Sequence, residues 1–276
     1  MTQRNYPLID SHAHVFGPSY AFSNPPSYTP HPSQRGTAQQ FLAVLDAHGL
    51  DYGLVVAAQP YGTDNSCMLD AIAASRGRLK GVALVDPSAG LAAWEDMHQR
   101  GVIGLRINLT TFGLKELMHP EAQRLFAFAK EIGWLLQVHC KGDELVDAVP
   151  LLRQTGLRLM FDHFGRPVLA KGQGQPGFQA LLELGRSSDA IVKLSGPFRC
   201  SMAGAPYEDT DSFVAAAIEA FTLDRCVWGS DWPFVPWEER VDYGPVYQSL
   251  YRWLPDEADR KRVLSDNPLK FFGFKR

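Results

Sequence analysis

Two histidines lie one residue apart in the segment YPLIDSHAHVFGP, where an apolar run of the chain ends. In a β-strand, residues two positions apart point to the same side, so we expect His12 and His14 to aim their imidazoles together. Each imidazole offers one nitrogen, and such a pair suits two adjacent ligand positions on a metal ion. The pair alone decides little, because histidines of an ordinary core give the same pattern.

Three more polar residues lie at the ends of apolar runs. His139 is near the end of LLQVHC, His163 near the end of LRLMFDHF, and Asp231 at the end of CVWGSD. The remaining histidines fall in loop-like or helix-like stretches and are interpreted as solvated or locally bonded: His31, His48, His98 and His119. Separate core residues would each need a buried partner. One shared site satisfies all five groups, so we expect them to converge.

The apolar runs that would position these groups recur eight times. They cover residues 6–15, 52–58, 79–86, 102–109, 135–140, 157–164, 191–196 and 226–232. The runs are rich in Val, Ile, Leu and aromatic residues and most alternate little, which is typical of strands buried on both faces of a parallel sheet. The polar groups then stand at the carboxyl ends of these strands.

Helical patterns separate the runs, at residues 37–48, 64–75, 91–100, 120–132, 143–153, 176–185 and 212–221. Eight strands alternating with helices in a chain of 276 residues favour a single-domain α/β fold, the (β/α)8 TIM barrel, over an open doubly wound sheet. No GxGxxG or GxxxxGK[ST] motif follows a strand, which disfavours nucleotide binding. A barrel of this kind keeps its active site at the carboxyl ends of its strands.

A long insertion follows the first strand. Residues 17–35, GPSYAFSNPPSYTPHPSQR, hold five prolines and show no periodicity. Long ordered loops on this face of a barrel often act as lids, and we expect a lid here; a surface decoration is the alternative. Tyr20 and Tyr28 in this loop are candidate lining residues of the site.

Three arginines give a clue to the substrate. Arg106 lies within VIGLRINL, Arg166 follows His163 in HFGRP, and Arg199 ends SGPFR. A guanidinium inside an apolar strand is costly unless paired, and its fork matches a carboxylate. We therefore expect an anionic, carboxylated small molecule as the substrate. The alternative is that each arginine pairs with a structural carboxylate such as Asp162. For Lys193, in IVKLSG, a structural role is expected first.

Composition limits the other classes of function. The net charge is −3 and no run of Lys and Arg is present, so nucleic acid is not expected as a partner. The four cysteines, Cys67, Cys140, Cys200 and Cys226, form no CxxC pair, as in a reduced intracellular protein. Nothing resembles a signal peptide or a membrane span. We expect a cytoplasmic protein that does not need a membrane.

The order of these residues resembles a known family. An HxH pair after strand one, His after strands five and six, and Asp after strand eight are similar to the amidohydrolase superfamily. More narrowly, the chain resembles the branch of 2-pyrone-4,6-dicarboxylate lactonase-like proteins. The likeness rests on the segments IDSHAHVFGP, HFGRP, VKLSGPFR, WGSDWP and SDNPLKFFGF and extends over nearly the whole chain.

The resemblance implies a hydrolase that opens a carboxylated lactone. Asp231 would activate the water and later protonate the leaving oxygen. His163 would bond the water or the carbonyl oxygen, with His12 and His14 beside it. The set implied for one divalent metal, zinc first and manganese second, is His12, His14, His139 and Asp231. The set implied for gripping the substrate is Arg106, Arg166, Arg199, Tyr20 and Tyr28.

Three questions stay open at this point. Some relatives in the lactonase branch work without a metal, so the resemblance does not decide whether one is needed. A metal-dependent, non-oxidative decarboxylase of an unsaturated or aromatic acid shares the same framework, and a non-catalytic anion-binding barrel is a further alternative. Barrels of this kind often form homodimers, which the sequence does not settle.

Overall fold

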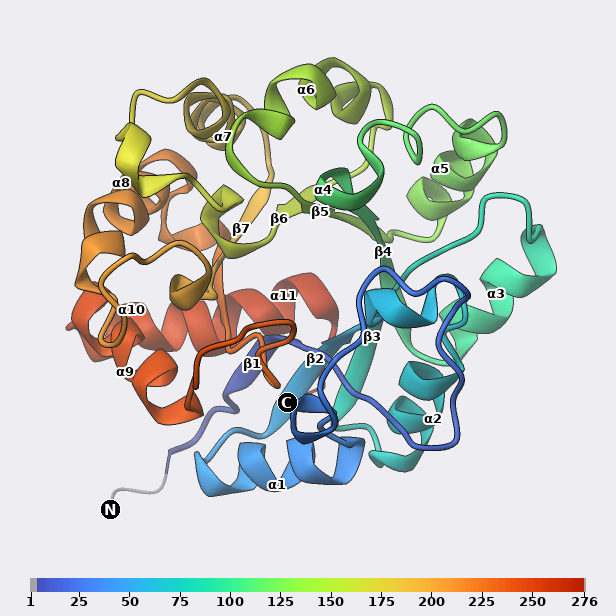
Figure 1. The fold of residues 1–276 in the computed structure, drawn as a ribbon, viewed down its shortest axis with the longest axis horizontal. Coiled ribbons are helices and arrows are strands. Elements are labelled where there is room, and N and C mark those ends of the chain that lie inside the picture. The colour runs from blue at the N-terminus through green and yellow to red at the C-terminus, as the bar shows by residue number, and fades with distance from the viewer. Residues whose placement is uncertain (1–3, 276) are drawn as a thin grey trace.

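Eight parallel strands run in chain order around a ring, with helices outside them (Figure 1). The computed structural model describes residues 4–275. The strands are β1 (Ile9–Ala13), β2 (Tyr52–Val56), β3 (Leu79–Ala83), β4 (Val102–Asn108), β5 (Leu135–His139), β6 (Leu159–Phe161), β7 (Ile191–Ser195) and β8 (Cys226–Gly229). All eight coincide with the expected apolar runs. The expected single-domain (β/α)8 barrel is confirmed.

The ring closes where the end of β8 meets β1. The backbone N–H of Asp231 donates to the carbonyl of His12 at 2.8 Å, and the N–H of His14 donates to the carbonyl of Trp232 at 2.7 Å. Ala13 and Trp232 form a parallel bridge between these hydrogen bonds. The closure therefore uses the same backbone segments that carry three of the expected site residues.

Helices cover the outside of the ring. They are α1 (Ala38–Ala47), α2 (Ser66–Ala74), α3 (Leu91–Gln99), α4 (Leu109–Phe112), α5 (Ala122–Glu131), α6 (Leu145–Gln154), α7 (Pro176–Ser187), α8 (Asp211–Phe221), α9 (Tyr243–Trp253), α10 (Glu257–Lys261) and α11 (Asn267–Phe272). The seven expected helices begin and end within two residues of the observed ones. The short α4 and the three helices after β8 were not expected from the sequence.

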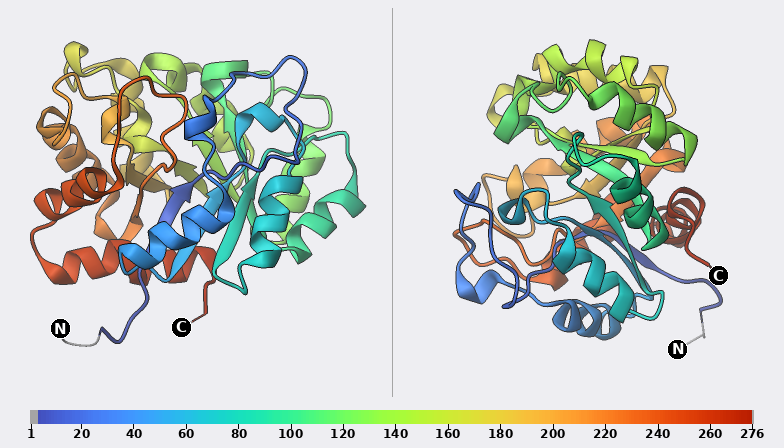
Figure 2. Two further views of the ribbon diagram at one scale, coloured as in Figure 1. Left: turned by 60° about the horizontal axis from the view of Figure 1, so that its bottom comes forward. Right: turned by 90° about the vertical axis from the view of Figure 1, so that its right-hand side faces the viewer.

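Helix α11 covers the amino-terminal end of the barrel. It crosses behind the centre of the ring in Figure 1, and the left view of Figure 2 places it opposite loop 17–35. Phe272 and Phe274 are buried and pack against apolar side chains that point inward from the strands, among them Ile9 and Leu135. This end of the barrel is thus sealed by apolar side chains, and the polar groups stand at the other end.

An irregularity in β1 aims the first histidine inward. Ile9 packs in the apolar interior, whereas Ala13 packs in the layer beneath the helices. The pairing of β1 with β2 shifts register between Asp10 and Ala13, as in a β-bulge. The shift lets His12, three residues after Ile9, return to the inner side, and His14 follows it two residues later.

Loop 17–35 lies on the carboxyl-terminal side of the barrel (Figure 2). It is irregular except for a 3₁₀ turn at Pro32–Gln34, and the Gln34 side chain donates to the carbonyl of Trp237 in the loop after β8. The two loops are therefore joined above the ring. In the part of the chain that the structure describes, no helix has the length and apolar character needed to cross a membrane.

The seal at the amino-terminal end should carry much of the barrel's stability. We predict that Phe272→Ala lowers the free energy of unfolding by about 3–5 kcal/mol, because it leaves a cavity under the ring. Phe112→Ala is the matched control: this side chain is 37% exposed, and its loss should cost less than about 1 kcal/mol. Urea unfolding followed by circular dichroism measures both. Equal losses in the two variants would contradict this role of α11.

Candidate active site

A cavity of about 200 Å³ opens at the carboxyl ends of the strands. Among its lining residues are eight of the expected ones: His14, Tyr28, Arg106, His139, His163, Arg166, Arg199 and Asp231. His12 is fully buried directly beneath, with its Nε2 3.3 Å from Nε2 of His14. Tyr20 does not line the cavity, and its hydroxyl instead donates to Asp70 at 2.7 Å.

Three ligand-type atoms meet at the floor of this cavity. Nε2 of His12 and Nε2 of His14 lie 3.6 and 3.5 Å from Oδ1 of Asp231. Tetrahedral zinc ligands at about 2.0–2.1 Å from the ion stand roughly 3.3 Å apart, so this triangle has a suitable size. Oδ1 of Asp231 is buried and has no hydrogen-bond partner within residues 4–275. The donor set His12, His14 and Asp231 therefore fits one divalent cation.

His139 lies outside this triangle. Its Nε2 accepts a hydrogen bond from Nη1 of Arg166 at 2.8 Å, and its Nδ1 is 3.5 Å from Oδ2 of Asp162. The structure does not bring His139 into either group of candidate metal ligands found in the described chain. His139 instead contacts Arg166 on one side and Asp162 on the other. Its role as a metal ligand stays a prediction.

His163 projects from a tight turn just after β6. Its backbone is left-handed, with φ of 49°, and its Nδ1 lies 2.9 Å from the hydroxyl of Ser195. The imidazole stacks on that of His12 with ring centroids 4.8 Å apart. A Cβ at position 196 would lie 2.7 Å from Nδ1 of His163, so Gly196 leaves the space that this ring occupies.

Asp162 connects the site to the barrel interior. Its Oδ2 accepts hydrogen bonds from Nε and Nη2 of Arg106 and from Nε2 of Gln137, at 2.9–3.1 Å. Its Oδ1 lies 3.2 Å from Nδ1 of His12 and 3.5 Å from Nζ of Lys193. Burial alone would raise the pKa of this carboxyl, but the surrounding positive groups hold it well below its usual range. Asp162 is therefore a permanent buried anion.

Asp231 is held in the same ionised state by Arg199. Nε of Arg199 donates to Oδ2 of Asp231, and Nη2 donates to the carbonyl of Val235 at 2.8 Å. Burial opposes ionisation, yet the guanidinium and His163 hold the pKa of the carboxyl well below its ordinary value. Oδ2 is thus engaged, and Oδ1 stays available to a ligand or a water molecule.

Three buried histidines, His12, His139 and His163, are neutral near pH 7. Burial, reinforced by Lys193, lowers the pKa of His12 to about 3, and burial with Arg106 lowers that of His139 to about 3. Burial also lowers the pKa of His163 well below its ordinary value. Lys193 is fully buried, and desolvation lowers its pKa to about 8. The charges of the site therefore come from its arginines, lysine and aspartates.

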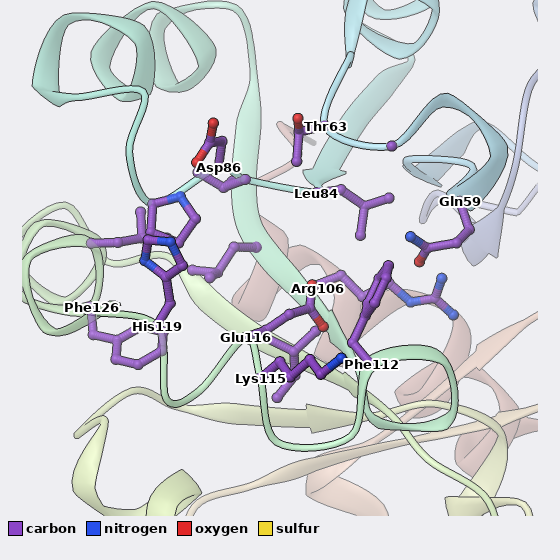
Figure 3. Close-up of a pocket in the computed structure, with 16 residues that line it drawn as sticks. Gln59, Thr63, Leu84, Asp86, Arg106, Phe112, Lys115, Glu116, His119 and Phe126 are labelled. Atoms are coloured by element: carbon purple, nitrogen blue, oxygen red, sulfur yellow. The ribbon is translucent and has the colours of Figure 1, made fainter. Parts of the chain in front are cut away.

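A second cavity of about 260 Å³ lies beside the first, between β3, β4 and α5 (Figure 3). Gln59 and Arg106 line both cavities. Glu116 lines the second one and accepts the backbone N–H of Asn108 at 2.6 Å, while the Asn108 amide donates to Gln59 at 3.1 Å. These hydrogen bonds form part of the wall between the two spaces.

Sequence reasoning missed Gln137 in the interior and expected only a structural role for Lys193. Gln137 and Lys193 form a hydrogen bond of 2.8 Å across the barrel, and Asp162 was considered only as a partner for arginine. Gln137 lies two residues before His139, and Lys193 lies two residues before Ser195. A strict application of the two-residue period along each strand would have placed them on the same inner face.

Comparison with known proteins agrees with this geometry. A family model described as amidohydrolase matches residues 9–274. The chain belongs to the amidohydrolase family. It is 32% identical to the 4-sulfomuconolactone hydrolase of Rhizobium radiobacter over 271 residues, which cover 96% of this chain and 89% of that protein. It is 28% identical to the 2-pyrone-4,6-dicarboxylate hydrolase of Comamonas testosteroni over 276 residues, covering 96% and 89%.

A solved structure shows the same architecture. The crystal structure of a probable 2-pyrone-4,6-dicarboxylic acid hydrolase from Acinetobacter baumannii, with citric acid bound, superposes with a TM-score of 0.89. That protein is 29% identical to this amidohydrolase, and the match covers 97% of this chain and 99% of the other. The expected membership in the lactonase-like branch of the amidohydrolases is confirmed.

Gly229 is required where β8 passes β1. A Cβ at this position would stand 2.6 Å from Cβ and 2.7 Å from the backbone nitrogen of His12. We predict that Gly229→Ala destabilises the protein by about 1–3 kcal/mol and disturbs the triangle of ligand atoms. In Gly244→Ala, an alanine would meet no atom within 4 Å, and stability should stay equal or rise by up to about 1 kcal/mol. Thermal unfolding compares them, and an unchanged melting temperature in Gly229→Ala would contradict the close approach.

Proposed function

We propose that this amidohydrolase hydrolyses the ring ester of a lactone that carries two carboxylates. The charge of the site carries this proposal. Three arginines line the cavity and Lys193 lies beneath it, whereas Asp162 and Asp231 are the buried anions that face them. These three arginines, one lysine and two aspartates together carry an excess of two positive charges. A dianionic substrate would balance that excess in a place where unpaired charge is costly.

The relatives support an anionic lactone. Their names specify 4-sulfomuconolactone and 2-pyrone-4,6-dicarboxylate as substrates, and each of these is a lactone with more than one acidic group. The similar Acinetobacter baumannii protein has citric acid, a tricarboxylate, bound in its crystal structure. The shared chemistry is a compact polyanion, which matches the charge excess of this cavity.

Asp231 is proposed to move the proton during the reaction. Its Oδ1 accepts a proton from a water molecule as the water oxygen bonds to the lactone carbonyl carbon. When the ring C–O bond breaks, the same carboxyl returns the proton to the leaving oxygen, so the product is an open-chain acid. Arg199 fixes Oδ2 throughout, which directs Oδ1 toward the cavity.

His163 is proposed to hold the carbonyl oxygen. If Nδ1 accepts the hydroxyl proton of Ser195, the neutral ring carries its proton on Nε2, which lies 3.6 Å from Oδ2 of Asp231. An N–H at this point donates to the oxygen on which negative charge develops. The stacking on His12 keeps the ring in that orientation.

A divalent cation would be held by His12, His14 and Asp231. Zinc is favoured over manganese for a site with two imidazoles. When bound, such an ion acidifies a coordinated water and polarises a carbonyl. The proton transfers assigned to Asp231 and the hydrogen bond assigned to His163 use the protein's own groups.

Arg106 and Arg166 are proposed to bind the substrate's carboxylates. Arg106 already uses Nε and Nη2 for Asp162, and Nε of Arg166 is buried without a hydrogen-bond partner in the described chain. Arg166 therefore has a donor ready for a ligand. Tyr28 brings loop 17–35 to the same cavity, and we propose that this loop covers the bound substrate.

Asp231→Asn tests the chemical step. We predict that kcat falls by about 10²–10⁴-fold, with binding of substrate retained, because the amide cannot accept the water proton. Loss of lactone absorbance for a pyrone dicarboxylate or a carboxylated muconolactone measures turnover, and release of CO2 is followed in parallel. Turnover that survives the substitution would reject the role of Asp231. Release of CO2 in place of ring opening would indicate a decarboxylase.

Arg166→Lys tests recognition of the substrate. Lysine keeps the charge but loses the planar fork. We predict that KM for a dicarboxylated lactone rises about tenfold, which corresponds to about 1.4 kcal/mol, and that KM for an uncharged lactone changes little. Arg186→Lys, at an exposed position on α7, is the matched control and should leave both values unchanged. An equal effect on charged and uncharged lactones would count against carboxylate binding.

A further inference from the structure

The second cavity is an opening in the layer between the barrel and its helices. Its walls are mainly buried apolar side chains: Leu84, Leu105, Ile107, Leu125 and Phe126. Protein interiors hold few voids larger than a water molecule, and apolar atoms that face a void lose their packing contacts. The cavity measures about 260 Å³, whereas an apolar cavity of about 150 Å³ is enough to bind benzene. A compact ring compound would therefore fit and restore the missing contacts.

One carboxylate reaches into this apolar space. Figure 3 shows Glu116 extending into the cavity between Phe112 on one side and Phe126 on the other. Its Oε2 accepts the backbone N–H of Asn108 at 2.6 Å, whereas its Oε1 has no hydrogen bond or ion pair among the residues that the structure describes. Burial raises the pKa of this carboxyl, although the Asn108 N–H and Arg106 oppose the rise. A donor placed at Oε1 would compensate the lost hydration.

The arginine, lysine and aspartate that also line the cavity leave this oxygen without a partner. Arg106 directs its Nε and Nη2 to Asp162, at 3.1 and 2.9 Å. Lys115 and Asp86 are exposed, and neither forms an ion pair in the described part of the chain. Exposed charges are screened by water far more than buried ones are. Glu116 is therefore a partly buried carboxylate that lacks a cationic partner.

We propose that the second cavity is a binding site for a small aromatic compound that carries an ammonium group. The ring fills the apolar space beside Phe112 and Phe126, and the ammonium donates to Oε1 of Glu116. A hydrogen bond between two charged groups is stronger than one between neutral groups, and the faces of aromatic rings also attract cations. Phe112 is partly exposed, which places one wall of the cavity at the molecular surface.

The first cavity does not compete for such a compound. Its arginines and the lysine beneath it outnumber its aspartates, so an ammonium group is repelled there. The two neighbouring cavities share Gln59 and Arg106 as a wall but present opposite charge to a ligand. They therefore select different classes of small molecule.

Benzylamine and benzyl alcohol are a matched pair of probes, because they differ only in the polar group. We expect benzylamine, which is protonated at pH 7, to bind the unaltered protein roughly tenfold more tightly than the alcohol does. In Glu116→Gln the affinity for benzylamine should fall by a similar factor and that for benzyl alcohol should change little, since the amide oxygen can still accept the Asn108 N–H. Titration calorimetry measures these affinities. Glu131→Gln, at an exposed position at the end of α5, is the matched control and should bind both probes as the unaltered protein does.

A crystal structure of the unaltered protein with benzylamine locates the ligand, so the proposal stays testable if Glu116→Gln does not fold. The ring should lie between Phe112 and Phe126, with its nitrogen within hydrogen-bond distance of Oε1 of Glu116. Absence of binding, equal affinity for the two probes, or a ligand seated elsewhere would overturn the proposal. Benzylamine affinity that is unchanged in a folded Glu116→Gln protein, or that falls equally in Glu131→Gln, would also overturn it. None of these measurements uses a lactone, so their outcome is independent of the proposed hydrolysis.

Discussion

The junction between β8 and β1 is the constraint on which the site depends. Two backbone hydrogen bonds at 2.7 and 2.8 Å join residues 12–14 to residues 231–232. The segments are more than two hundred positions apart in the chain, yet their backbones carry the two histidines and the aspartate that face each other. Gly229 allows this approach because no side chain separates the strands. Ring closure and assembly of the reactive groups are therefore one event.

Charge balance explains why polar residues lie in the barrel interior beneath the cavity. Asp162 gathers Arg106, Gln137 and Lys193 beneath the cavity, and Arg199 holds Asp231 at its wall. Asp162 and Asp231 each have a positively charged partner, which limits the cost of desolvation. The remaining positive excess is directed at the open cavity. The same residues therefore keep the barrel centre stable and supply the positive charge on which the proposed binding of an anion depends.

Much of this arrangement could be predicted from the sequence, and the limits have physical causes. The long apolar runs predicted the eight strands, and the residues at the ends of these runs predicted the candidate site. Both predictions succeeded because they depend only on the local sequence pattern. The C-terminal helices α9 to α11 were missed, since each packs on the completed barrel more than it follows a strand-helix repeat. His139 is hydrogen-bonded to Arg166 because the left-handed turn after β6 directs Arg166 back toward β5. The apolar pattern of a single strand does not predict such a turn, so this contact could not be predicted. The position of Tyr20, which is hydrogen-bonded to Asp70, could not be predicted either, because an irregular loop has no residue periodicity that indicates where its side chains point.

The apolar seal formed by α11 also bears on how the chain matures. Phe272 and Phe274 fill the base of the barrel, and the opposite face needs residue 231 to meet residue 12. During synthesis on the ribosome, the inner faces of the strands stay uncovered until residues 272–274 have emerged. Over that interval the apolar inner faces are exposed to solvent, which is the condition under which partly folded chains aggregate.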